Sequence, residues 1–124
     1  MSPQGFTDEY APTGCIRLGA WSMEPTHADM VTCRATIAYA DRIMSLQAQS
    51  TGPIGAMTSI LYDLGAPVQI VRFHQREVDG AITTYLLCEN DDRQCWACGT
   101  GDTRDEANFN ALIAGANRLL DGAA

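Results

Sequence analysis

The sequence predicts an α+β fold of two pseudo-symmetric βββα units, in which one helix covers each antiparallel sheet. The first observation is that apolar residues recur at every second position, as in strands, and then at every third or fourth position, as in a helix. The second is that this change occurs twice, because the two predicted helix starts, Gly52 and Thr103, lie 51 residues apart. We therefore expect one domain over residues 15–122, preceded by a flexible, polar arm over residues 1–14.

The first unit is expected to contain three strands and a helix. The strands are predicted near residues 15–22, 30–39 and 43–49, and the helix near residues 52–65. In the second strand, Val, Cys, Ala, Ile and Tyr occupy the odd positions and mostly polar residues the even ones, so one face should be buried. The helix start is predicted because hydroxyl residues precede Pro53, whose fixed φ suits the first turn.

The second unit repeats this order. Its strands are predicted near residues 68–78, 81–89 and 94–98, and its helix near residues 103–121. Asp79-Gly80 is a hairpin signal between the first two strands. Thr103 and Glu106 have the spacing of a capping box, which indicates a helix start.

Composition excludes several classes of function. The 15 acidic and 8 basic residues give a net charge of −7, which repels phosphate backbones and anionic lipid, so we expect neither a nucleic-acid nor a membrane partner. No lysine is present, which excludes a Schiff base with pyridoxal phosphate and a phosphate-loop lysine. No apolar run approaches the roughly 18 residues of a membrane span. We expect no cofactor.

The five cysteines are an odd number, and the first residues do not resemble a signal peptide, so we expect free thiols and a cytoplasmic location. Cys95 and Cys98 have the spacing of a metal or redox motif. In an extended strand, however, residues three apart point to opposite faces, and a second cysteine pair is missing. Cys88 and His74 are the remaining candidates for a four-ligand set, but buried thiols are the preferred interpretation and we expect no metal.

Three segments carry a resemblance to a known family. They are Thr51-Gly52-Pro53-Ile54-Gly55-Ala56, Gly99-Thr100-Gly101-Asp102 and Asn117-Arg118-Leu119-Leu120. In order and spacing they resemble the C-terminal regulatory, dimerising domain of α-isopropylmalate synthase, shared with citramalate synthase, over about Cys15 to Leu120. The resemblance implies two βββα units, a homodimer, and an end-product amino acid that binds near the dimer interface and inhibits a separate catalytic barrel.

The chain also departs from that family. Gly55 stands where its members usually have aspartate, and Arg104-Asp105 stand where apolar residues usually follow the glycine pair. The 124 residues contain no catalytic barrel.

The two glycine-containing helix starts are the best candidates for a ligand site, because unpaired N–H groups and the helix dipole attract a carboxylate. The candidate ligand-binding residues are Thr51, Gly52, Ile54, Gly99, Gly101 and Asp102. The alternative is that the glycines only permit tight strand-to-helix turns. The first functional hypothesis is a homodimeric binding module for a carboxylate metabolite, such as a branched-chain amino acid, that acts in trans on a synthase.

The second hypothesis is a small enzyme that uses the effector pocket for acid–base chemistry on a carboxylate or acyl substrate. His74 is the candidate base, Arg72 or Arg76 would hold the anion, and Cys95 or Cys98 would be a second proton donor or nucleophile. The competing interpretation of His74 is an exposed or interface histidine without catalytic function. Five aromatic residues fit the core, a dimer interface or an apolar pocket, and the sequence leaves these open: Trp21, Tyr39, Phe73, Tyr85 and Trp96.

Overall fold

The computed structural model describes residues 16–121 and confirms two βββα units. The first unit comprises β1 (Ile16–Pro25), β2 (Val31–Tyr39), β3 (Arg42–Ser50) and α2 (Pro53–Leu64). The second comprises β4 (Gln69–Val78), β5 (Ala81–Asn90), β6 (Arg93–Gly101) and α3 (Arg104–Asp121). The predicted arm over residues 1–14 lies outside the described residues.

Each unit forms its own three-stranded antiparallel sheet, in the order β1-β2-β3 or β4-β5-β6. Short turns join the strands, as the sequence predicts. At the turn between β4 and β5, Asp79 and Gly80 both have positive φ, 54° and 82°, which matches the twist of a two-residue hairpin. Ala40 and Asp91 take the same left-handed conformation in the turns between β2 and β3 and between β5 and β6.

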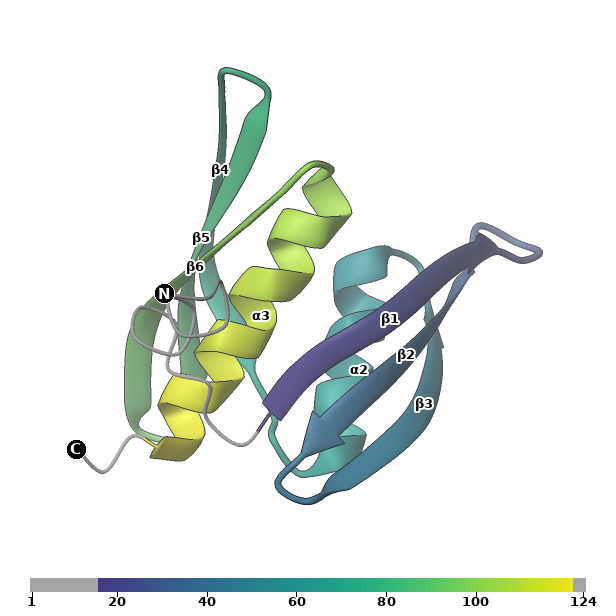
Figure 1. Cartoon of the computed structure of the whole chain (residues 1–124), viewed down its shortest axis with the longest axis horizontal. Helices are drawn as coiled ribbons and strands as arrows, with labels where there is room; N and C mark the ends of the chain where they lie inside the picture. The colour runs from purple at the N-terminus through teal and green to yellow at the C-terminus, as the bar shows by residue number, and fades with distance from the viewer. Residues whose placement is uncertain (1–15, 122–124) are drawn as a thin grey trace.

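The sheets lie on the outside of the molecule and the helices lie between them (Figure 1). Helix α2 packs on β2 and β3, whereas α3 packs on β5 and β6, touches α2 and reaches β1. Both helices begin at the same end of the molecule (Figure 1). The core fills the space between the sheets with fully buried side chains, among them Ile37, Met57, Ile60, Leu61, Leu86, Phe109 and Leu112. None of the helices within residues 16–121 is long and apolar enough to cross a membrane.

Two strands, β1 and β6, extend three residues beyond their predicted ends. Strand β1 continues to Pro25, past an irregularity in its pairing between Leu18 and Trp21. Strand β6 continues to Gly101, so the glycine pair that was expected to form a loop before the second helix lies within a strand. Strand β6 includes Gly99 because of a tertiary contact. A Cβ at this position would overlap backbone atoms of α3, so glycine lets the strand pass directly against the helix.

Candidate functional site

The start of α2 is open. Its N-cap, Gly52, is extended (φ −159°, ψ 164°), makes no side-chain hydrogen bond to the helix, and no acidic residue lies in the first turn. Ala56 N donates to Gly52 O at 3.0 Å, and Pro53 has no N–H. The N–H groups of Ile54 and Gly55 therefore have no acceptor among the described residues. Two free donors at the positive end of a helix favour an anion.

The start of α3 is closed by its own side chains. Thr103 Oγ1 accepts a hydrogen bond from Glu106 N at 3.1 Å, which confirms the helix start predicted from the capping-box spacing. The carboxylate of Glu106 also turns back to accept from Asp102 N at 2.6 Å. Asp105 adds a second acidic group to the first turn. A ligand carboxylate would have to displace these groups, so this helix end does not favour an external anion.

The structure also gives the second pair of candidate glycines a packing role. A Cβ at Gly99 would overlap α3 at Ala107 and Ala111, and a Cβ at Gly101 would lie within 2.7 Å of carbon atoms of the Glu106 side chain. At Gly52, by contrast, a Cβ would meet nothing within 4 Å. The geometry therefore separates the six candidate ligand residues into an open group at α2, comprising Thr51, Gly52 and Ile54, and a closed group at α3, comprising Gly99, Gly101 and Asp102.

The two helix starts are at the same end of the molecule (Figure 1). Burial and, secondarily, the Asp105 carboxylate at the start of α3 raise the pKa of the Cys33 thiol. Cys33 pairs with Ala48, two residues before the end of β3, and α2 follows β3 directly. Acidic groups of α3 thus lie toward the end of the molecule where the positive start of α2 is open.

His74 lies on the outer face of the second sheet and is exposed. Arg72 and Arg76 share this face, as the alternation predicts. The His74 ring lies beside that of Tyr85, with 6.1 Å between the ring centroids, and its side chain makes no hydrogen bond within residues 16–121. Cys98 lies beyond Tyr85, on β6. These positions leave the proposed base exposed to solvent and without an orienting partner, so they do not favour acid–base catalysis at His74.

The three cysteines of the second sheet divide between its two faces, as the strand alternation predicts. Cys88 and Cys95 are cross-strand partners on the face that meets α3, where Cys95 Sγ lies 3.9 Å from Gly115 O. Cys98 is exposed on the other face, so the expectation of buried thiols is wrong for this residue because its side chain points away from α3. In the described part of the chain, no group of three or more His, Cys, Asp or Glu side chains is placed to hold a metal ion.

Cys88 should make the protein sensitive to alkaline pH. Burial and, secondarily, Cys95 raise the pKa of the Cys88 thiol from 9.0 to about 12. The pKa is higher in the folded state than in the unfolded state. The contribution of the protonated Cys88 thiol to the free energy of unfolding is therefore complete below about pH 9 and is lost as pH rises toward 12. Denaturant unfolding of reduced protein between pH 8 and 11 should show the wild type losing up to about 1.4 kcal/mol per pH unit more than Cys88→Ala. Parallel pH profiles of the two proteins would contradict this assignment.

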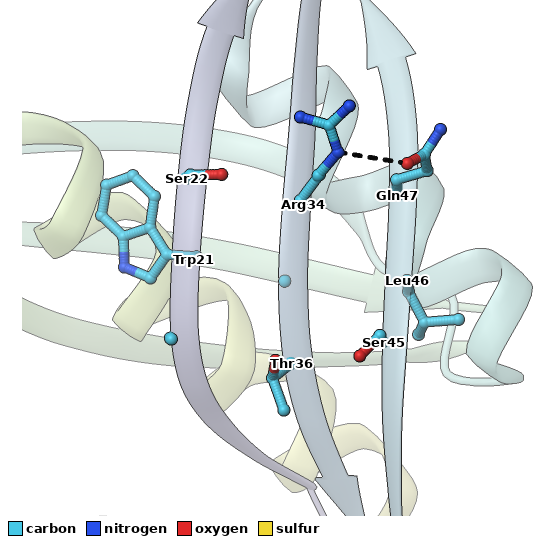
Figure 2. A pocket seen from close by; sticks show the side chains of 9 residues that line it. Trp21, Ser22, Arg34, Thr36, Ser45, Leu46 and Gln47 are labelled. Atoms are coloured by element: carbon cyan, nitrogen blue, oxygen red, sulfur yellow. Dashed lines mark hydrogen bonds between the residues drawn. The ribbon is translucent and has the colours of Figure 1, made fainter.

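A hollow of about 350 Å³ lies on the outer face of the first sheet, beside the irregular part of β1 (Figure 2). Its polar lining includes Ser22, Arg34, Thr36, Ser45 and Gln47. Arg34 donates to Gln47 at 3.3 Å and to the Glu24 carboxylate at 3.0 Å, so its charge is already paired. The sequence analysis did not select these polar residues as a candidate site, although the alternation of β2 places Arg34 and Thr36 on its solvent-exposed face. The paired cation makes the hollow a weaker anion site than the start of α2.

Comparison with known proteins relates the chain to 2-isopropylmalate synthases. No family model matches it. The synthase of Renibacterium salmoninarum is 26% identical over 131 residues, and that of an Arthrobacter species is 25% identical over 128 residues. Each similarity covers 94% of this chain but only 22% of the relative. This confirms the resemblance found in the sequence and supports a regulatory-type domain that corresponds to a small part of such a synthase.

Proposed function

We propose that this protein is a small-molecule-binding regulatory module whose ligand is a carboxylate metabolite such as a branched-chain amino acid. The observation that carries the proposal is the open start of α2. There the Ile54 and Gly55 N–H groups are free, the N-cap is glycine and no carboxylate competes in the first turn. A ligand carboxylate that accepts from these two donors would also interact favourably with the helix dipole.

The start of α3, which lies at the same end of the molecule, favours an amino acid over other carboxylates. Asp102, Asp105 and Glu106 gather negative charge at the end of the molecule where α2 also begins. An amino acid presents a carboxylate and an ammonium group, which are complementary to the α2 start and to this acidic group. A 2-oxo acid carries only the first of these charges, so it should bind more weakly.

The similarity to 2-isopropylmalate synthases supplies the biological setting of the proposal. The matched region is a small part of each relative, so the catalytic activity of those synthases is not transferred to this chain. In the proposed function the module works as a homodimer and controls a synthase in trans.

A thermal-shift series with Leu, Ile and Val, followed by the corresponding 2-oxo acids, tests the ligand class. A ligand at 100 times its dissociation constant should stabilise the fold by about 2.7 kcal/mol. We expect a shift with at least one amino acid and a smaller one with its 2-oxo relative. Absence of a shift with all of these compounds would contradict the proposed function.

Two substitutions at one position test the site itself. In Gly52→Asp the new carboxylate is placed to cap α2 and occupy its free N–H groups, so the fold should be as stable as the wild type or more stable, while ligand binding is lost. Gly52→Ala leaves those N–H groups free and meets no neighbouring atom, so it should still bind. Equal binding by the two variants, measured by calorimetry, would place the ligand elsewhere.

A further inference from the structure

Two cysteines of the second sheet face each other across neighbouring strands. Cys88 of β5 is the register partner of Cys95 of β6, and both side chains lie on the face that meets α3. Opposite Cα atoms in an antiparallel pair lie about 4.5–5.5 Å apart, within the range of roughly 4.4–6.8 Å that a disulfide spans. The strand register therefore places these two thiols where one S–S bond can join them without a change of topology or pairing.

Helix α3 meets both sulfurs at one position. Cys95 Sγ lies 3.9 Å from Gly115 O, and a Cβ at Gly115 would overlap Cys88 Sγ. Because Gly115 has no side chain, it leaves room for both sulfurs beneath the helix. The two thiols are also close enough to interact electrostatically, since burial first and Cys95 second raise the pKa of the Cys88 thiol.

The two thiols differ in their access to solvent, and this difference sets the order in which they react. Cys95 is partly exposed, whereas Cys88 is fully buried. A small reagent in solution therefore reaches Cys95 first. Cys88, which burial keeps protonated, lies directly opposite and is placed to react second.

No other cysteine within residues 16–121 has a cysteine opposite it. Cys33 pairs with Met23 and Ala48, and Cys98 pairs with Tyr85. The Cys-X-X-Cys spacing within β6 does not describe the pair that the fold brings together, because its two members point to opposite faces of the sheet. The cross-strand pair is thus the dithiol that the tertiary structure assembles in the described part of the chain.

We propose that Cys88 and Cys95 are an oxidation site, at which a small organic disulfide such as oxidised glutathione converts the two thiols into a reversible intrachain disulfide. The Cys95 thiolate attacks one sulfur of the external disulfide, so a mixed disulfide forms and one external thiolate leaves. Cys88 then loses its proton and attacks Cys95 Sγ, which releases the second external thiolate. The two released thiols carry away the two electrons and the two protons that the protein loses.

The geometry favours a bond that is easily reduced again. Cβ atoms of opposite residues lie about 4.5–5.5 Å apart, whereas those of a disulfide lie about 3.5–4.5 Å apart, so β5 and β6 must approach each other slightly. A displacement of this kind makes a disulfide more reducible. Because α3 packs on the pair at Gly115, oxidation also changes the contact between this helix and its sheet. The oxidation site is separate from the ligand site of the proposed function and does not depend on it.

Oxidation of the folded protein, followed by mass spectrometry, tests the pairing. The starting protein is a Cys15→Ser, Cys98→Ser variant, which retains Cys33, Cys88 and Cys95 and whose fold is checked by circular dichroism. After exposure to oxidised glutathione and alkylation in denaturant, we expect the mass to fall by two hydrogen atoms and one thiol, that of Cys33, to be alkylated. Dithiothreitol should restore all three thiols.

Trypsin identifies the bond directly. Arg93 lies between the two cysteines, so cleavage after it separates peptide 77–93, which contains Cys88, from peptide 94–104, which contains Cys95. The two peptides should stay joined after oxidation and separate after reduction. Removal of Cys98 makes this assignment unambiguous, because peptide 94–104 then contains one cysteine.

Cys88→Ala in the same background is the matched control. It retains Cys95 without its partner, so the reaction should stop at the mixed disulfide and leave a glutathione adduct on Cys95. A stable adduct of this kind in the protein that retains Cys88 would overturn the proposal. A disulfide that includes Cys33, or three thiols that stay reduced in the folded protein, would also overturn it. Ligand-induced thermal shifts test the proposed function separately.

Discussion

Replacing Gly99 by alanine should lower the free energy of unfolding by about 3 kcal/mol, at the upper end of the usual cost of overpacking. The added Cβ would overlap the backbone of α3, with Ala107 O only 2.8 Å away and Asn110 C 2.6 Å away. Backbone atoms cannot rotate aside as a flexible side chain does, so α3 would have to move away from β6. Chemical denaturation monitored by tryptophan fluorescence measures the change.

Gly52→Ala is the matched control for this substitution. The same methyl group at Gly52 meets nothing within 4 Å, and the local φ of −159° is open to any residue. Its cost should stay below about 1 kcal/mol, the difference between glycine and alanine at an N-cap. Similar losses in the two variants would show that Gly99 is not placed by contact with α3.

Asn117→Ala should destabilise the protein by about 3 kcal/mol, because it leaves two buried backbone groups without partners. Asn117 Nδ2 donates to Ile16 O at 2.8 Å, and Asn117 Oδ1 accepts from Ile16 N at 2.9 Å. The amide thus pairs with the first residue of β1 as another strand would, and it ties the first sheet to the last helix. Asn117 and Ile16 are both buried, so water cannot replace the lost bonds.

Asn110→Ala is the control on the same helix. Asn110 also bonds to backbone, donating to Thr100 O at 2.8 Å, but it is exposed and water can replace it. Its loss should cost less than about 1 kcal/mol, partly offset by the better helix propensity of alanine. Hydrogen exchange at Ile16 N–H should accelerate in Asn117→Ala and not in Asn110→Ala. Equal exchange in both would contradict the role assigned to Asn117.

Local signals predicted most of the fold correctly. The positive φ values at Asp79 and Gly80 follow from a residue pair that tolerates them, and the start of α3 follows from the Thr103–Glu106 spacing. Strand alternation placed His74 between Arg72 and Arg76 on one face. Each of these features depends on residues within a few positions of one another, so the sequence alone contains the necessary information.

The candidate site was predicted only in part. The sequence selected both helix starts, because each contains glycine beside a cap. Only the folded structure distinguishes them, since the Glu106 side chain hydrogen-bonds across the start of α3, whereas the N-cap of α2 makes no side-chain hydrogen bond to its helix.

The sequence by itself determined the two βββα units, their turns and the faces of their strands, because periodicity and capping act over short distances. Tertiary structure alone decided that Gly99 belongs to a strand pressed against α3, that Asn117 bonds to Ile16 across 101 positions, and that one sheet keeps its aromatic side chains exposed. Each of these three features depends on which residues of another helix or sheet pack against the residue in question. Sequence spacing does not encode that contact, because it arises only when the helices and sheets are assembled.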